Sequence, residues 1–247
     1  MSLQPRFSII TVTFNAAGVI EPTLQSVSVQ TYKNYEHLLI DGASTDDTLA
    51  RAIASGISFS HIVSEKDKGL YDAMNKGISL ATGDYLCFLN AGDALYAPDT
   101  LERMVAALDG MNELPDVLYG ETAEVDDERR FMRMRRLQAP ENLTWKSFKQ
   151  GMLVCHQAFF VRRDKAQSYD LKYRFSADVD WCIRVMKNSK RLVNTHTIIV
   201  NYLQNGLSLQ NHRASLLERY DIMCKHYGVV STFFYHVWFV LRALIKK

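Results

Sequence analysis

The feature that most restricts the fold of this chain is a regular alternation of apolar, β-rich runs with helical patterns in its first hundred residues. The strand-like runs are 7–13, 37–41, 58–63 and 85–89, and the helical patterns lie near 21–30, from 46, and near 71–81. Strands separated by helices indicate βαβ units, which build a parallel sheet covered by helices on both faces. Ligands of such sheets bind beyond the carboxyl ends of the strands. The polar residues that follow each run are therefore the first candidates for a functional site.

The rhythm changes after residue 108. Here we expect strands at 117–125, 130–137 and 157–161, a helix carrying Trp145, a helix at 178–187, a long β-rich run at 192–203 and a helix near 212–226. No flexible linker separates this part from the first. We therefore expect residues 1–108 and 109–227 to be two halves of one α/β domain, followed by an apolar helix over residues 228–247.

The C-terminal segment 229–245 is strongly apolar and aromatic, but polar residues interrupt it and Lys246 and Lys247 close it. It is marginal in length for a membrane-spanning helix, which needs roughly 20 apolar residues. Two interpretations are favoured over a span. The helix packs on the body or on a sister subunit of a homodimer, or it lies in a membrane interface.

Composition excludes several classes of protein. The 47% of hydrophobic and 23% of charged residues are typical of a folded domain, and the net charge of +2 gives no indication of nucleic-acid binding. The basic run 129–136 is interrupted by apolar residues and is interpreted as a strand with one wet face. The four cysteines form no CxxC pair, and no secretory signal opens the chain, so we expect a reducing, cytoplasmic setting.

Polar turns follow the first two strands. The run 11–15 reads TVTFN, and the run 41–48 reads DGASTDDT. A carboxylate at Asp41 could accept a hydrogen bond from N3–H of uracil, a contact that adenine does not offer. The alternative is that Asp41 only closes a turn while Ser44 or Thr45 caps the next helix.

The third and fourth segments add a glycine-led helix start and a second acid. Segment 64–77 runs from a polar turn through Gly69 into a helix, where free N–H groups and the helix dipole favour phosphate oxygens. A capped surface helix explains Gly69 almost as well. Segment 83–93 ends in Asn90-Ala91-Gly92-Asp93, and a carboxylate there could share a divalent cation with a diphosphate. In isolation this tetrapeptide is only a turn.

Together the four segments resemble, in order and spacing, the family 2 glycosyltransferases with the GT-A fold, above all bacterial enzymes of capsule, exopolysaccharide or O-antigen synthesis. The resemblance implies a Rossmann-like, mostly parallel twisted sheet flanked by helices, a nucleotide-sugar donor, and Mn²⁺ or Mg²⁺ as cofactor. It implies metal binding by Asp93 and nucleotide binding by Val12, Thr13, Phe14, Asp41, Asp67, Lys68, Gly69, Asp72 and Asn75. The chain departs from the family where Asn90 stands in place of one acid of the usual pair, and where Gly42 replaces a second acid after Asp41.

A further resemblance in the second half supplies a base. Segment 175–184 is similar to the acidic motif of the family, with Asp178 at the position of the catalytic base and Ala177 in place of the common Glu. Such a carboxylate removes the proton of an acceptor hydroxyl. With no second carboxylate placed as a nucleophile, direct displacement with inversion is the simpler mechanism. Asp180 is a weaker acceptor-side candidate, because pairing with Arg184 at i,i+4 spacing explains it better.

Two more segments resemble acceptor-side motifs. His156 and Gln157 follow Cys155 and precede an inward strand, so we expect them to contact the acceptor or the donor phosphate; the alternative is a buried, satisfied histidine. Segment 205–208, which ends in Ser208, resembles a glycine-rich loop that could act as a lid.

The leading hypothesis is thus an inverting transferase that uses a UDP-sugar at the inner face of the membrane, on a saccharide or lipid-linked acceptor. A nucleotidyltransferase is the second hypothesis, but segment 13–18 lacks the basic residues of its phosphate loop. A degenerate sugar-nucleotide binding module is the third, and Asp178 in its motif argues against it.

Overall fold

A computed structural model describes residues 3–203 and 211–245. The first half contains β1 (Phe7–Thr13), α1 (Ile20–Ser28), β2 (Tyr35–Asp41), α2 (Thr48–Ala54), β3 (His61–Ser64), α3 (Leu70–Leu80), β4 (Tyr85–Phe88), β5 (Ala94–Leu95) and α4 (Thr100–Ala106). The second half contains β6 (Val117–Val125), β7 (Phe131–Met134), η1 (Trp145–Gln150), η2 (His156–Ala158), β8 (Phe159–Arg162), η3 (Arg163–Lys165), α5 (Ala177–Lys187), β9 (Leu192–Leu203), α7 (His212–Tyr227) and α8 (Val229–Ile245). The expected α/β architecture is confirmed.

All described strands belong to one sheet, in the order β3-β2-β1-β4-β8-β6-β9-β5, with β7 paired to β6. Strands β3, β2, β1 and β4 run parallel, as the βαβ pattern predicted. The second half is mixed: β6 pairs parallel with β9 but antiparallel with β7 and β8. The description of the sheet as mostly parallel therefore holds for the first half alone, because short connections such as that from β6 to β7 allow antiparallel pairing.

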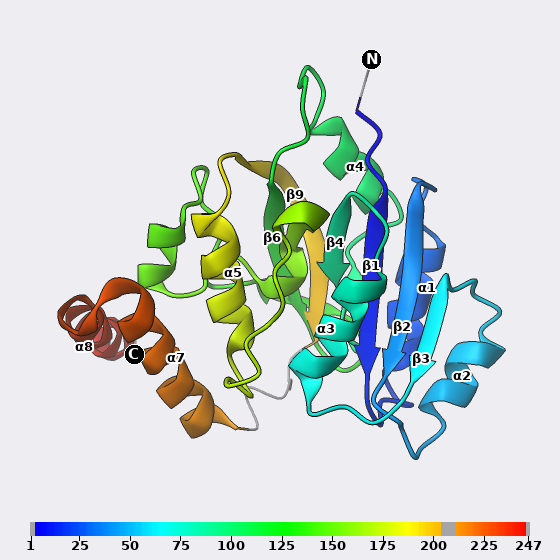
Figure 1. Cartoon of the computed structure of the whole chain (residues 1–247), viewed down its shortest axis with the longest axis horizontal. Coiled ribbons are helices and arrows are strands. Elements are labelled where there is room, and N and C mark those ends of the chain that lie inside the picture. Colours follow the sequence, from blue (N-terminus) through cyan, green and yellow to red (C-terminus); the bar gives the residue numbers. More distant parts are fainter. Residues whose placement is uncertain (1–2, 204–210, 246–247) are drawn as a thin grey trace.

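Helices cover both faces of the sheet. In Figure 1, α3 and α5 lie in front of the strands, and α1 lies behind them. Every side chain of β1 is buried, as expected for a central strand covered on both faces. Gly77 of α3 faces Ile10 of β1, and a β-carbon at position 77 would overlap the Ile10 side chain. Gly77 thus allows α3 to approach the strand that leads into the candidate site.

The sequence patterns missed or misassigned some short elements. Neither β5 nor α4 was predicted, and a strand of two residues is too short to show a periodicity. The expected helix with Trp145 is a 3₁₀-helix. The strand expected from Gln157 begins at Phe159, because residues 156–158 form a 3₁₀ turn first.

Helix α5 begins under a carboxylate supplied by α7. Glu218 accepts hydrogen bonds from the backbone N–H groups of Arg174 at 2.8 Å, Phe175 at 2.8 Å and Ser176 at 2.9 Å. These three N–H groups belong to the N-cap Ser176 and the two residues before it, so Glu218 satisfies the backbone donors of the turn that leads into α5, and the helix dipole favours an anion at this end. One side chain of α7 thereby fixes the turn that precedes Asp178.

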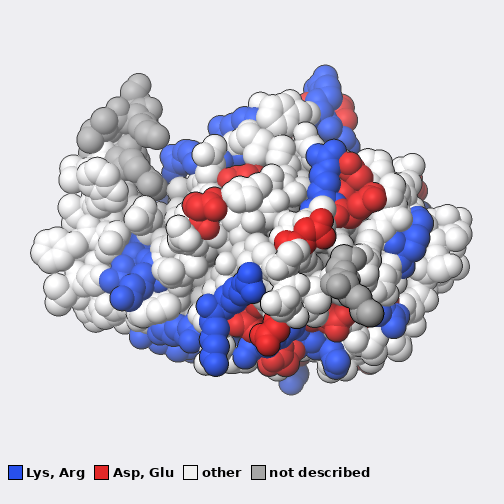
Figure 2. Space-filling model, turned by 90° about the horizontal axis from the view of Figure 1, so that it is seen from above, with Lys and Arg blue, Asp and Glu red and all other residues white. Residues whose placement is uncertain are grey.

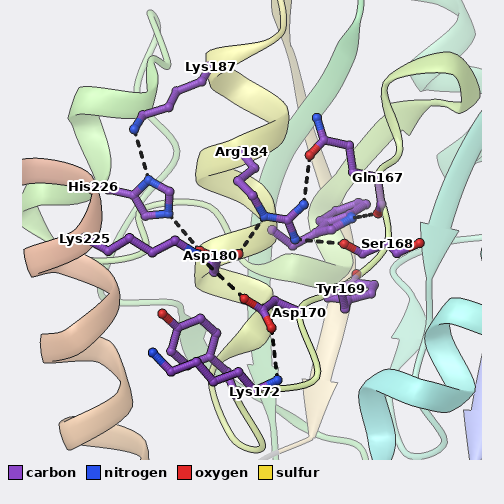
Figure 3. A network of polar contacts seen from close by, with 12 residues as sticks. Gln167, Ser168, Tyr169, Asp170, Lys172, Asp180, Arg184, Lys187, Lys225 and His226 are labelled. Atoms are coloured by element: carbon purple, nitrogen blue, oxygen red, sulfur yellow. Dashed lines mark hydrogen bonds and ion pairs between the residues drawn. The ribbon is translucent and has the colours of Figure 1, made fainter.

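Asp180 is the second link between α5 and α7. Its carboxylate is fully buried and receives Arg184 Nε at 2.6 Å, Lys225 Nζ at 3.0 Å and His226 Nε2 at 2.8 Å. Figure 3 shows these three side chains converging on it. The expected i,i+4 pairing with Arg184 is confirmed. Burial opposes ionisation, but hydrogen bonds from His226, Arg184 and Lys225 outweigh it and lower the pKa of Asp180 far below its usual value.

Helix α8 extends from α7 at one end of the molecule (Figure 1). Its contacts are with α7 and η1. Within residues 3–203 and 211–245, no helix has the length and apolar character that crossing a membrane requires.

Replacing Asp180 by Asn should destabilise the protein, because it leaves three cationic or polar groups without their anion. Breaking a buried ion pair costs about 3–5 kcal/mol. Because Arg184 and Lys225 are partly exposed, we expect the free energy of unfolding to fall by about 3 kcal/mol. Urea unfolding at pH 7 measures it. The control is Asp99→Asn, which removes an exposed i,i+4 pair with Arg103 and should change stability by less than about 1 kcal/mol. Equal losses in the two variants would contradict this assignment.

The lowered pKa of Asp180 also predicts that the stability of the protein depends on pH. A carboxyl group whose pKa is lowered by folding stabilises the protein above its unfolded pKa of about 3.9, and this contribution disappears as the pH falls below that value. The difference in unfolding free energy between the unchanged protein and Asp180→Asn should therefore shrink between about pH 5 and pH 2. A difference that stays constant over this window would show that Asp180 is not the group responsible.

Candidate active site

A cavity of about 1030 Å³ opens at the carboxyl ends of the parallel strands. It is lined by segments after β1, β2 and β4, by the start of α3, and by residues of η2, α5, β9 and α7. Both halves of the chain thus contribute walls. Its size is at the upper end of the range for small-molecule sites, which run to about 1000 Å³.

The cavity brings together most of the residues that the sequence singled out. Those lining it are Val12, Thr13, Phe14, Asp67, Gly69, Asp93, His156, Gln157 and Asp178. Those that do not line it are Asp41, Lys68, Asp72, Asn75 and Asp180. Ser208 lies outside the described residues.

Asp41 closes a turn instead of facing the cavity. It is fully buried, and its oxygens accept hydrogen bonds from the Ser44 N–H at 3.0 Å, the Ser44 hydroxyl at 2.5 Å and the Ser64 hydroxyl at 2.6 Å. The expected contact of Asp41 with uracil is corrected by the structure, because Asp41 does not line the cavity and its oxygens bind Ser44 and Ser64 instead. The alternative of a turn-closing role is the one that the structure shows.

The carboxylate that faces this corner of the cavity is Asp67. A β-carbon at Gly42 would lie 3.0 Å from Asp67 Oδ2 and 3.3 Å from Phe14 Cδ2, so the glycine makes room for both side chains. The Phe14 ring is 63% exposed. Burial raises the pKa of Asp67, while Lys76, with Nζ 2.6 Å from Asp67 Oδ1, partly offsets the rise. An exposed ring beside an acceptor oxygen suits a planar heterocycle with an N–H donor.

Three residues expected to bind nucleotide instead shape the wall behind it. The backbone N–H of Lys68 donates to Asp72 Oδ2 at 2.9 Å, which fixes the turn before α3. Asn75 donates to the Tyr169 carbonyl at 3.1 Å and accepts from the Tyr169 N–H at 2.7 Å. None of the three lines the cavity, and Asn75 faces the segment around residue 169. They hold Gly69 and Tyr169 in position.

Asp178 enters the cavity from the first turn of α5. The Tyr71 hydroxyl donates to Asp178 Oδ1 at 3.1 Å, and burial followed by the charge of Asp178 raises the pKa of Tyr71. Nearby, His156 stacks on Phe88 with ring centroids 5.3 Å apart and shares a hydrogen bond with the Tyr169 hydroxyl. Burial lowers the pKa of His156 to about 4, so its ring is neutral at pH 7. His156 is thus both buried and satisfied, and it lines the cavity.

Asp93 sits where the two halves meet. Its Oδ2 accepts from Gln157 Nε2 at 2.7 Å, and its Oδ1 accepts from the Leu203 N–H at 3.1 Å. Burial raises the pKa of Asp93 to about 7, although these two donors and Arg129 act in the opposite direction. Gln157, expected on the acceptor side, therefore holds Asp93 in place.

The protein could supply only some of the ligands of a divalent ion at this corner, and the rest would have to come from outside it. Among the described residues, no group of three or more His, Cys, Asp or Glu side chains could hold a metal. Asn90 Oδ1, from the same turn as Asp93, is buried without a hydrogen-bond partner. A cation that takes one carboxylate, one amide oxygen and several non-protein oxygens matches the preference of Mg²⁺ and Mn²⁺ for hard oxygen ligands.

Several charged residues of the cavity were not found from the sequence. They are Lys66, Glu124, Asp127, Arg135, His212 and Arg219. The basic run contains the predicted strand, β7, but both of its faces are exposed and not one alone; Arg135 follows it and turns inward, donating to the carbonyls of Leu137 and Leu153. His212 and Arg219 come from α7, and no local pattern shows where that helix packs. Figure 2 views the opposite edge of the molecule, where acidic and basic side chains are interspersed.

Comparisons with known proteins agree on the family. The model of glycosyl transferase family 2 matches residues 8–169. A PGL/p-HBAD biosynthesis glycosyltransferase of Mycobacterium bovis is 38% identical over 211 residues, covering 82% of this chain and 78% of the relative. The amylovoran biosynthesis glycosyltransferase AmsB of Erwinia amylovora is 28% identical over 208 residues, covering 79% of this chain and 69% of the relative.

Solved structures share the fold. A crystal structure of S. aureus TarS, residues 1–349, has a TM-score of 0.70 at 15% identity and covers 95% of this chain and 72% of that one. The mannosyltransferase PcManGT of Pyrobaculum calidifontis, solved with GDP-Man and Mn²⁺, has a TM-score of 0.65 at 15% identity and covers 95% of this chain and 70% of that one. With its family-model match and its mycobacterial relative, the chain belongs to glycosyl transferase family 2 and is a glycosyltransferase.

Proposed function

We propose that this glycosyltransferase transfers a sugar, with inversion, from a nucleoside diphosphate sugar to a hydroxyl group of a saccharide or lipid-linked acceptor in the synthesis of a cell-surface glycan. The observation that carries the proposal is that Asp93 and Asp178, from different halves of the chain, line one cavity. The names of the mycobacterial and Erwinia relatives support a glycan or glycolipid product. A TarS structure solved with UDP-GlcNAc, at TM-score 0.67 and 18% identity, supports a uridine donor through a shared fold.

The nucleotide is proposed to bind between the end of β1 and the start of α3. Phe14 offers its ring to the base, and Asp67 offers an acceptor for N3–H of uracil. The diphosphate lies toward Gly69 and the amino end of α3, where free N–H groups favour an anion. Lys66 adds a positive charge to the same wall.

A divalent cation, Mn²⁺ or Mg²⁺, is proposed to bind at Asp93 and Asn90. When bound, such an ion neutralises the charge that develops on the departing diphosphate. Gln157 and the Leu203 N–H fix the orientation of the Asp93 carboxylate. The unpartnered Asn90 Oδ1 is the one oxygen of this turn that is ready for a new contact.

Asp178 is proposed as the base that takes the proton of the acceptor hydroxyl. Tyr71 holds one carboxylate oxygen, which leaves the other for the acceptor. Since no side chain of the cavity is assigned as a nucleophile, a single displacement with inversion is the simpler mechanism. The acids in the cavity argue against a degenerate binding module, and family membership argues against a nucleotidyltransferase.

Buried free thiols at Cys87, Cys155 and Cys182 fit a cytoplasmic location.

The Asp178→Asn variant should still bind the donor but should no longer transfer the sugar efficiently. Because the amide cannot accept the hydroxyl proton, turnover is expected to fall about 10²- to 10⁴-fold. Calorimetry with UDP and Mn²⁺ should give an unchanged affinity. Asp164→Asn, an exposed acid away from the cavity, is the control and should leave turnover as it is. Normal turnover by Asp178→Asn would remove this residue from the mechanism.

Asp93→Ala should abolish the increase in UDP affinity that Mn²⁺ produces, because the carboxylate ligand is lost. The matched control is Asp127→Ala, which removes another acid of the cavity and should preserve the metal response. Titration of UDP with and without Mn²⁺ measures both. A metal response that survives in Asp93→Ala and disappears in Asp127→Ala would place the ion at the other wall.

The metal response should also depend on pH. Since burial raises the pKa of Asp93 to about 7, the metal-free protein carries a proton on this carboxyl at lower pH, and a cation must displace it. We expect the Mn²⁺-dependent gain in UDP affinity to weaken as the pH falls from 8 to 6. UDP titrations across this range provide the measurement, and a gain that rises toward low pH would contradict the assignment.

A further inference from the structure

Helix α8 carries a stripe of large apolar side chains that face solvent. Val229, Val230, Phe233, Phe234, Val237, Trp238 and Leu241 are each between 42 and 72% exposed. Their spacing repeats at one and four residues, which places them on one side of the helix. The other side packs inward, with Thr232 fully buried and His236 against Tyr220 of α7. A contiguous exposed patch of several apolar side chains marks an interaction surface.

The surroundings of the stripe are positively charged. From residue 222 to the end, the sequence contains no Asp or Glu and includes Arg242, Lys246 and Lys247, whereas Lys225 pairs with Asp170 and Asp180. Lys149 of η1 lies 5.5 Å from the ring centre of Tyr227 and 6.0 Å from that of Tyr235, next to α8. In Figure 2 the left end of the molecule, where Figure 1 places α8, shows uncharged atoms with basic side chains beside them.

Lys146 and Lys187 belong to the same group. Both lie over the Trp145 ring, at 5.8 and 4.6 Å from its centre. Over the ranges 3–203 and 211–245, neither they nor Lys149 forms an ion pair with a carboxylate. No carboxylate of the described residues neutralises these charges.

We propose that α8 docks through this stripe on an anionic lipid bilayer. Helices of this kind lie in the interface with the apolar side buried about 5–10 Å and basic residues at the headgroups. Trp238 suits that depth, since tryptophan prefers the boundary between headgroups and acyl chains. A symmetric dimer through α8 would bring the lysines of two copies together and leave them uncompensated. Charge complementarity therefore favours lipid over a second copy.

The docked helix leads to the cavity. Leu216 of α7 lines the cavity, and Tyr220, one turn later, contacts His236 of α8 with ring centres 5.0 Å apart. His236 borders a groove of about 300 Å³ together with Phe233, Val237 and Leu241. Tyr220 and His236 thus lie between the stripe and Leu216 at the wall of the cavity. This last step rests on the proposed function, because it gives an acceptor with a lipid tail a path to Asp178; the docking itself does not depend on it.

Vesicle flotation of the whole protein tests the docking. We expect binding to vesicles of phosphatidylglycerol and phosphatidylcholine, weak binding to phosphatidylcholine alone, and a decrease with salt. The double variant Phe234→Ser and Trp238→Ser should lower the partition coefficient at least about tenfold, because it removes two large apolar groups. The control Ile53→Ser and Phe131→Ser removes two apolar side chains of similar exposure elsewhere and should bind normally.

Charge variants and light scattering complete the test. Lys146→Gln with Lys149→Gln should weaken binding to the anionic vesicles about fivefold for each lysine. The protein without lipid should scatter as a monomer. Absence of binding to anionic vesicles, equal binding by the stripe variant, or a dimer that the stripe variant dissolves would each overturn the proposal. None of these measurements uses catalytic activity, so failure here is distinct from failure of the proposed function.

Discussion

The site depends on the parallel register of β1 with its two neighbours. Thr13 at the end of β1 lies beside Asp41 at the end of β2, and Ile10 lies beside Phe88 at the end of β4. β2 ends level with β1 and β4 ends three residues earlier, yet all three run in the same direction, so the turns that follow them lie at one edge of the sheet. The backbone reinforces this, since the Gly42 N–H donates to the Thr13 carbonyl and the Ala91 N–H to the Val12 carbonyl. Hydrogen bonds of the sheet, and not contacts between catalytic side chains, define where the cavity lies.

The two halves of the chain meet through polar groups that also serve the cavity. Asp93 of the first half accepts from Gln157 and from the Leu203 N–H of the second. Tyr71 of the first half donates to Asp178 of the second. Each acid proposed for chemistry is thus held by a donor from the other half. A relative movement of the halves would disturb both acids at once, so the proposed chemistry depends on the packing that joins them.

Local sequence predicted the parts of the fold that local rules govern. The bounds of β1, β6 and β9 agree with the apolar runs, and Phe14, Gly69 and Asp93 lie in the cavity because strand ends and helix starts are visible as patterns. Asp178 came from a resemblance to a family motif. The roles of Asp41 and Asn75 were wrong or incomplete because their partners, Ser64 and Tyr169, lie far along the chain. The roles of Arg219 and Glu218 follow from where α7 packs, and no local sequence pattern predicts that position.

Gly42 links two positions that are distant in sequence. A β-carbon at position 42 would lie only 3.0 Å from Asp67 Oδ2 and 3.3 Å from the Phe14 ring, so an acid there would have to displace one of these side chains. The negative charge of this corner therefore stands on the segment after β3 instead of on the turn after β2. The two positions are coupled by volume and by charge: a substitution at one restricts the residues acceptable at the other. Among homologues, positions 42 and 67 should accordingly change as a pair, with a small neutral residue at one accompanying an acid at the other.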